Sequence, residues 1–115
     1  MLMNSTIPTI EPLEAIKLIS DGAQLVDVRE IHEWNAGHAE YATHIPLGSL
    51  SELLHLIDRE KSVIVCCRAG SRSSRATTYL LEQGINAKNL SGGMNSWAEV
   101  GLEIVDASGA NGFIV

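Results

Sequence analysis

The sequence predicts an α/β fold, a three-layer sandwich in which a mainly parallel central sheet is flanked by helices. Short apolar runs alternate with amphipathic helical patterns from end to end, and strands separated by helices pair in parallel through crossover connections. Hydrophobic residues make up 45% of the chain but aromatic residues only 4%, so the core should consist mainly of aliphatic side chains. A chain of 115 residues can bury one such core without a metal or a disulfide.

The first half of the chain contains one clear helix and one buried strand. Pro12 opens a helix with an apolar face, and Gly22 ends it. Residues 24–28 (QLVDV) are predicted to form a buried strand. We expect a brief helical turn over 30–35 and a short extended segment over 43–46, which its proline ends.

A second helix is predicted over residues 49–57. Ser49 and Glu52 have the spacing of a capping box. Apolar residues follow at i, i+3, i+4 and i+7, the pattern of a helix with one face against a sheet. These residues are Leu50, Leu53, Leu54 and Ile57.

The second half repeats the strand–helix alternation. We expect a central strand over 62–66, a helix over 73–83 that Gly84 ends, and a further strand over 87–90. The inward face of the helix should carry Ala76, Tyr79 and Leu80. Gly92 and Gly93 form a turn into a last helix over 94–100. The expected organisation is an N-terminal extension (1–8), one domain (9–105) and a loose C-terminal tail (106–115).

The region of greatest chemical interest is 63–73, where an apolar run ends at two cysteines and an Arg/Gly/Ser loop leads into a helix. A strand can hold the Cys67 thiol still, while loop N–H groups and the positive end of the helix stabilise a thiolate. Ligand sites in parallel sheets form beyond the carboxyl ends of the strands, where Cys67 would lie. We call these loop and helix donors around Cys67 the thiol cradle. Because side chains alternate along a strand, Cys66 should point away from it and into the core.

The charge distribution favours a small anionic substrate. The formal net charge is −6, which argues against general binding of nucleic acid. Three of the eight basic residues nevertheless lie within eight positions beside Cys67, namely Arg68, Arg72 and Arg75. This local cluster would attract an anion to an otherwise acidic protein.

Two adjacent cysteines are unsuited to a disulfide framework, so we expect free thiols. No basic segment followed by a long apolar run begins the sequence, and no apolar stretch reaches membrane-spanning length. We therefore expect a cytoplasmic protein that does not bind membranes. His32, His44 and His55 lack the mutual spacing of a metal site. We expect neither a metal nor a cofactor.

Four segments in this order are similar to the motifs of one family: 25–30 (LVDVRE), 33–38 (EWNAGH), 67–73 (CRAGSRS) and 90–97 (LSGGMNSW). On these motifs the chain resembles the single-domain rhodanese (thiosulfate sulfurtransferase-like) family, from about Ile10 to Val105. The run 39–46 departs from the family pattern, which concerns substrate preference more than the reaction.

The resemblance implies a rhodanese-like fold and sulfur transfer with Cys67 as the nucleophile. Thiosulfate or another persulfide would donate sulfur to Cys67, and a thiophilic acceptor such as cyanide or a cellular thiol would remove it in a ping-pong reaction. A sulfur-carrier protein is a further possible partner. The substrate-binding residues implied are Arg68, Ala69, Gly70, Ser71 and Arg72. Asp27, Arg29 and His38 match family positions and are interpreted as supports of the surrounding loops.

Three alternatives stay open. A cysteine phosphatase or arsenate reductase also places a cysteine and an arginine around an oxyanion. Cys67 and Arg72 enclose four residues, one fewer than in the phosphatases, so we expect little phosphatase activity. A non-enzymatic binding module with this fold, and a relay that takes sulfur from a partner protein, are the other two.

Overall fold

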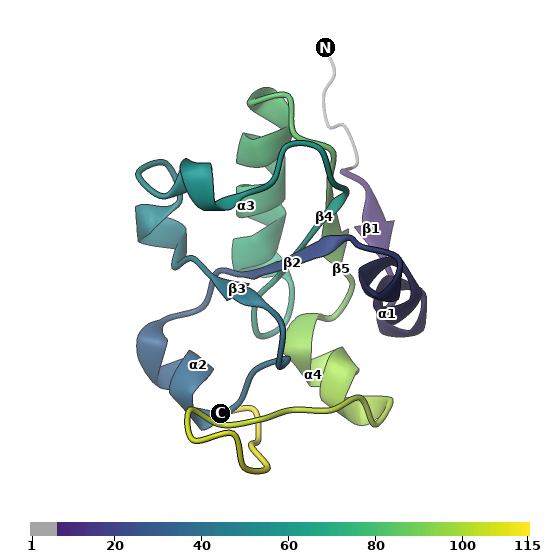
Figure 1. Cartoon of the computed structure of the whole chain (residues 1–115), viewed down its shortest axis with the longest axis vertical. Coiled ribbons are helices and arrows are strands. Elements are labelled where there is room, and N and C mark those ends of the chain that lie inside the picture. Colours follow the sequence, from purple (N-terminus) through teal and green to yellow (C-terminus); the bar gives the residue numbers. More distant parts are fainter. Residues whose placement is uncertain (1–6) are drawn as a thin grey trace.

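The computed structural model describes residues 7–115 and confirms the α/β sandwich (Figure 1). Its sheet has five strands in the order β1-β5-β4-β2-β3, and every neighbouring pair is parallel. The strands are β1 (Thr9–Ile10), β2 (Gln24–Asp27), β3 (Thr43–His44), β4 (Val63–Cys66) and β5 (Ala87–Leu90). The strand before the cysteine loop is therefore the central one.

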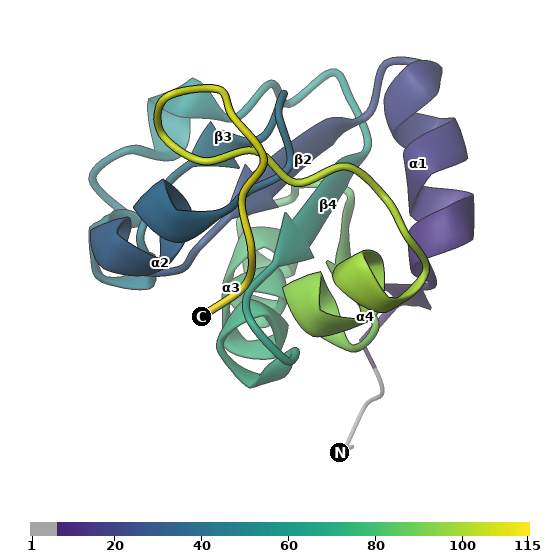
Figure 2. The same ribbon diagram turned by 90° about the horizontal axis from the view of Figure 1, so that it is seen from below.

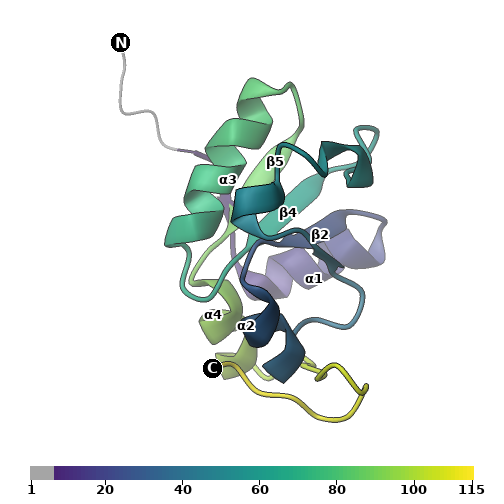
Figure 3. The same ribbon diagram turned by 90° about the vertical axis from the view of Figure 1, so that its left-hand side faces the viewer.

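Helices cover both faces of the sheet (Figures 2 and 3). They are α1 (Pro12–Ser20), α2 (Ile31–Ala36), α3 (Ser71–Glu82) and α4 (Gly93–Glu99), with two 3-10 helices at Leu47–Ser49 and Leu54–Leu56. Side chains of α1 and α4 pack on one face, and those of α3 and the 3-10 segment pack on the other. Within residues 7–115, none of these helices has both the length and the apolar character needed to cross a membrane.

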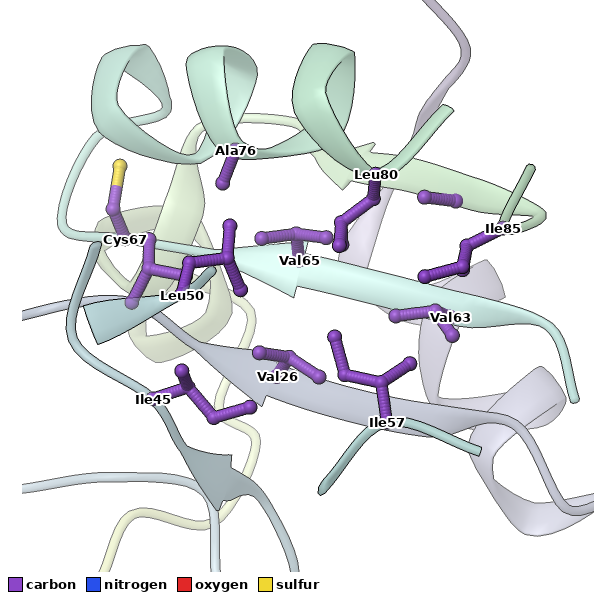
Figure 4. Close-up of a cluster of buried hydrophobic side chains, with 12 residues drawn as sticks. Val26, Ile45, Leu50, Ile57, Val63, Val65, Cys67, Ala76, Leu80 and Ile85 are labelled. Carbon is purple, nitrogen blue, oxygen red and sulfur yellow. The ribbon is translucent and has the colours of Figure 1, made fainter. Parts of the chain in front are cut away.

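The alternation of side chains along β4 separates the two cysteines. Val63, Val65 and Cys67 belong to the core on the α3 side, and Ile64 and Cys66 to the core on the α1 and α4 side. Figure 4 shows the Cys67 sulfur directed toward α3 from the end of β4. The prediction that Cys66 points away from the cradle is confirmed.

The prediction of an α-helix over 49–57 is wrong, because the segment contains the end of one 3-10 helix (Leu47–Ser49) and all of a second (Leu54–Leu56), and their N-cap residues are Pro46 and Leu53 rather than Ser49. The side chain of Gln24 explains how the second 3-10 helix ends. Its Nε2 donates to the Leu56 carbonyl oxygen at 2.9 Å, and its Oε1 accepts from Asp58 N–H at 2.8 Å. These bonds satisfy backbone groups that a continuing helix would have used. The four apolar residues still pack against the sheet, as the pattern predicted.

Two other elements differ from the prediction. No strand is predicted at the position of β1. It has only two residues, too few for a periodic pattern, and it forms by pairing with β5. Helix α3 begins at Ser71, two residues earlier than predicted, because Gly70 adopts a left-handed conformation (φ +119°) and turns the chain directly into the helix.

The segment 106–115 is not loose, which corrects the expectation. It turns back toward α2 (Figure 1). There Ala107 N–H donates to the Asn35 carbonyl oxygen at 3.0 Å, and Phe113 N–H donates to that of Ala36 at 3.1 Å. Ile114 packs against the core on the α1 and α4 side. The domain boundary at residue 105 remains a prediction.

Candidate active site

The Cys67 thiol lies directly after β4, among donors from the loop and from α3. Gly70 N–H donates to Sγ at 3.1 Å, and the Ser73 hydroxyl lies 3.2 Å from it. Cys67 is only 1% exposed, so water competes little for these contacts. The positive end of the 12-residue α3 faces the same place. The chain thus surrounds this sulfur with groups that stabilise negative charge.

These donors change the acidity of the thiol. Burial raises the pKa of Cys67, but the Ser73 hydroxyl and the N–H groups of Ser73, Gly70 and Ala69 outweigh it and hold the pKa below its ordinary value. The sequence interpretation ended the site at Arg72 and missed Ser73. The signal for Ser73 was its position three residues after Gly70, within the first turn of a helix that begins at a left-handed glycine.

Cys66 has the opposite environment. Burial in the apolar core raises the pKa of its thiol well above the ordinary value. Both cysteines are free. Within residues 7–115, no group of three or more His, Cys, Asp or Glu side chains is arranged to hold a metal ion. Cys67 is therefore the thiol suited to nucleophilic chemistry.

The start of α4 anchors the other side of the cysteine loop. Met94 N–H donates to the Cys67 carbonyl oxygen at 2.8 Å, and Asn95 N–H donates to that of Arg68 at 2.9 Å. A β-carbon added to Gly93 would lie 2.5 Å from the Cys67 oxygen and 2.6 Å from the Arg68 oxygen. The close approach of helix and loop thus requires glycine at position 93.

Asp27, Arg29 and His38 lie outside the thiol cradle. Arg29 binds Asp27 through Nε and Nη2, at 3.0 and 2.7 Å, and also donates from Nη2 to the Gly37 carbonyl oxygen at 2.7 Å. Both members of this ion pair are fully buried. His38 donates from Nδ1 to the Trp34 carbonyl oxygen at 2.7 Å and stacks on the Trp34 ring. These contacts brace the end of β2 and the turn after α2.

Arg72 is held by a carboxylate that the sequence interpretation did not single out. Its Nη1 and Nη2 donate to the two oxygens of Glu33, at 2.7 and 2.9 Å. Glu33 is also the acceptor for Glu30 N–H at the start of α2. Hydrogen bonding to Arg72 lowers the pKa of Glu33 to about 2, against the opposing effect of burial. The ion pair therefore joins α2 to the first turn of α3.

The other four predicted loop residues differ from Arg72 in solvent exposure and in charge pairing. Arg68, Ala69 and Ser71 are exposed, and Gly70 is half-buried. Within residues 7–115, neither Arg68 nor Arg75 forms a salt bridge. The charge of Arg72 is offset by Glu33, whereas Arg68 and Arg75 present theirs to solvent.

The Glu33 pair predicts a pH-dependent contribution to stability. Because the pKa of Glu33 is about 2 in the folded state against an ordinary 4.5, this contribution is complete above pH 4.5 and is lost as the pH falls toward 2. We expect Glu33→Gln to lower the free energy of unfolding at pH 7 by about 3 kcal/mol. The difference from wild type should shrink between pH 5 and pH 2, as measured by urea denaturation.

Glu60→Gln is the matched control, because Glu60 is an exposed carboxylate, and it should leave stability nearly unchanged at every pH. A Glu33→Gln difference that stays constant down to pH 2 would contradict the role of this ion pair.

The chain is similar to known proteins in sequence and in fold. A family model, the rhodanese-like domain, matches residues 11–100. The chain is 37% identical over 93 residues to the putative sulfurtransferase YtwF of Bacillus subtilis, covering 81% of this chain and 86% of that protein. It is 35% identical over 107 residues to the thiosulfate sulfurtransferase GlpE of Actinobacillus pleuropneumoniae, covering 91% and 99%.

Solved structures show the same likeness. A rhodanese-related protein from Thermoplasma volcanium superimposes with a TM-score of 0.80 at 31% identity, over 85% of this chain and 97% of that one. A rhodanese-like domain protein from Staphylococcus aureus gives 0.76 at 30% identity, over 84% and 97%. The motifs, the fold and the matched length agree, and the chain belongs to the rhodanese-like domain family.

Proposed function

We propose that this protein is a sulfurtransferase that moves sulfane sulfur from thiosulfate, or another persulfide donor, to a thiophilic acceptor through a persulfide on Cys67. The observation that carries the proposal is the surroundings of the Cys67 sulfur: it accepts a hydrogen bond from Gly70 N–H, the Ser73 hydroxyl lies 3.2 Å away, and the pKa of the thiol is lowered. Membership of the rhodanese-like domain family, and relatives named as sulfurtransferases, support this class of reaction.

The reaction has two balanced steps. The Cys67 thiolate attacks the outer sulfur of thiosulfate, a new S–S bond forms, and the old S–S bond breaks with its electron pair leaving on sulfite. The acceptor then attacks the outer sulfur of the persulfide, and the electron pair of that S–S bond returns to Cys67 as a thiolate. Cyanide becomes thiocyanate, and a thiol becomes a persulfide. Because the first product leaves before the acceptor reacts, the kinetics are ping-pong.

The test is to follow both half-reactions. With thiosulfate alone, the reduced enzyme should release one sulfite per active site. With thiosulfate and cyanide varied together, double-reciprocal plots should give parallel lines. Intersecting lines, or thiocyanate formed without prior release of sulfite, would overturn the two-step scheme.

Arg68 is proposed to attract the anionic donor, together with Arg72. Arg68 directly follows the nucleophile and is exposed, without a salt bridge in the described part of the chain. Reversing its charge with Arg68→Glu should lower kcat/KM for thiosulfate about tenfold at low ionic strength, and added salt should reduce the difference. Initial-rate measurements at several salt concentrations check this expectation.

Lys17→Glu is the control for this prediction. It makes the same change in net charge at an exposed position on α1, which packs on the opposite face of the sheet from α3. Equal losses in the two variants would show that overall charge, rather than Arg68, governs capture of the donor.

A groove beside the active loop favours a sulfur relay as the second candidate. Its volume is about 590 Å³, and its lining includes Leu50, Arg72, Arg75 and Tyr79. Leu50 also packs in the same core cluster as Cys67. Because the lining also contains Glu30, the groove is a surface of mixed apolar and charged character at the first turns of α3, and a protein that carries a persulfide could bind such a surface. Faster sulfur uptake from a persulfidated protein than from thiosulfate would favour the relay, and the reverse would favour the small donor.

A further inference from the structure

Asn89 contacts the active loop from β5 and has no part in the two-step scheme. Its Nδ2 donates to the Gly70 carbonyl oxygen at 3.1 Å, and its Oδ1 accepts from the Ser73 hydroxyl at 2.6 Å. The side chain is nearly buried, with 7% of the residue exposed. Asn89 therefore binds both residues whose donor groups lie within hydrogen-bond distance of the Cys67 sulfur.

The Ser73 hydroxyl has more acceptors than protons. Its oxygen lies 2.6 Å from Asn89 Oδ1, 3.2 Å from Cys67 Sγ and 3.2 Å from the Gly70 carbonyl oxygen. A hydroxyl carries one proton and makes one strong donation at a time. The short contact to Asn89 holds this proton while Cys67 is neutral, whereas a charged sulfur competes far better for it.

The amide of Asn89 cannot turn round to remove this competition. Its Nδ2 donates to the Gly70 carbonyl oxygen, so a flipped amide would place two acceptor oxygens against each other. The backbone is fixed as well, because Asn89 N–H donates to the Pro8 carbonyl oxygen at 2.9 Å and the residue pairs with Val65 and Thr9 in the sheet. Oδ1 consequently stays an acceptor for Ser73.

We propose that Asn89 is a positioning residue that holds the Ser73 hydroxyl proton away from Cys67 in the thiol state and releases it when the thiol ionises. On ionisation the thiol proton passes to solvent, and the Ser73 O–H group rotates about its Cβ–Oγ bond from Oδ1 to Sγ. No bond of Ser73 breaks. Oδ1 is left as a buried acceptor without this donor, which makes the thiolate less favourable than the cradle alone would make it.

The restraint has a chemical use. Thiolates with a very low pKa are weaker nucleophiles, because nucleophilicity falls as the pKa falls. By binding the Ser73 proton until Cys67 ionises, Asn89 keeps the pKa of the thiol from falling too far. The thiol can still ionise, and the thiolate stays a strong nucleophile. This step rests on the proposed role of Cys67 as the nucleophile.

Other titratable groups near the sulfur act independently of Asn89. Cys66 precedes Cys67 on β4 with its side chain in the core on the opposite face, and Arg72 lies in the first turn of α3 with its charge offset by Glu33 from α2. None of them is hydrogen-bonded to Asn89 or Ser73 in the described part of the chain. A change at Asn89 therefore acts on the sulfur through Ser73 or through the Gly70 loop, and the variants below separate the two.

The experiment measures ionisation of Cys67 by the ultraviolet absorbance of its thiolate across pH, in a Cys66→Ala background with one thiol. Asn89→Ala, and the larger Asn89→Leu, should lower the midpoint by about 0.5 to 1 pKa unit, the effect of one net hydrogen bond. Asn89→Asp should raise it, since a carboxylate binds the Ser73 proton more tightly. Ser73→Thr should preserve the wild-type midpoint, because it keeps the hydroxyl.

Two controls identify the route of the effect. In a Ser73→Ala background, Asn89→Ala should produce no shift. Asn86→Ala removes an exposed asparagine whose side chain bonds only Ser62 among the described residues, and it should also leave the midpoint unchanged. Urea denaturation establishes which variants are folded at the pH values used.

A raised midpoint in folded Asn89→Ala and Asn89→Leu would overturn the proposal, because Asn89 would then act only as a prop for the Gly70 loop. A shift that persists without the Ser73 hydroxyl would overturn it equally. The titration involves no sulfur transfer, so it is independent of the proposed function. If the expected shifts occur but Cys67 forms no persulfide, the role of Asn89 stands and the proposed reaction is refuted.

Discussion

Asp27→Ala is expected to lower the free energy of unfolding by about 3–5 kcal/mol, the typical effect of removing one member of a buried ion pair. The variant would leave the Arg29 guanidinium fully buried without its carboxylate partner. The remaining Arg29 contacts, to the carbonyl oxygens of Gly37 and Glu33, do not neutralise its charge. Urea denaturation at neutral pH measures the change.

The chain offers a matched control in an exposed ion pair. Lys61 Nζ lies 3.9 Å from Asp58, and both side chains are about half exposed. Lys61→Ala should change the free energy of unfolding by less than about 0.5 kcal/mol. If the two variants lost similar stability, the Asp27–Arg29 pair would not be the structural centre that its burial indicates.

Gly93→Ala is expected to lower kcat/KM for sulfur transfer about 100-fold, the scale of a displacement near 1 Å at a reacting group. The new methyl group would lie 2.5 Å from the Cys67 carbonyl oxygen and 2.6 Å from that of Arg68. Backbone atoms cannot swing aside as a flexible side chain can, so either the loop or α4 must move. Steady-state kinetics, together with urea denaturation, measure the effect.

Gly101→Ala is the control that separates the two effects of Gly93→Ala, the steric clash of the new methyl group and the strain of a positive φ. Gly93 and Gly101 both have positive φ, +59° and +82°, but an added β-carbon at Gly101 meets nothing within 4 Å. Gly101→Ala should cost about 1–2 kcal/mol of stability and leave kcat/KM near wild type. Equal activity in the two variants would mean that the contact between α4 and the loop does not position Cys67.

The parts of the site that are continuous in sequence were predictable. Strand β4, the cysteine loop and α3 follow one another, so the place of Cys67 beyond the end of a central strand followed from pattern and spacing. The partners from other elements were not predictable in this way. Glu33 is 39 residues from Arg72, and Asn89 is 16 residues from Ser73. These contacts depend on how α2 and β5 pack around the loop.

The errors in the fold have the same origin. Ser49 and Glu52 have the local spacing of a helix start, but the segment packs on the sheet as two 3-10 helices, and the end of the second is bound by Gln24, 32 and 34 residues from Leu56 and Asp58. Residues 106–115 lack a periodic pattern, and their order comes from backbone hydrogen bonds to α2. Local propensity carries no information about either contact.

The intact mass of the protein shows directly whether Cys67 carries the transferred sulfur. Three proteins are compared: wild type, Cys67→Ser and Cys66→Ser. Each is reduced and exposed to thiosulfate, its intact mass is measured under non-reducing conditions, and sulfite release is followed alongside. We expect a gain of one sulfur atom in wild type and Cys66→Ser, with none in Cys67→Ser. A gain in Cys67→Ser, or no gain in any protein whose thiols were shown to be reduced, would contradict the proposed role of Cys67.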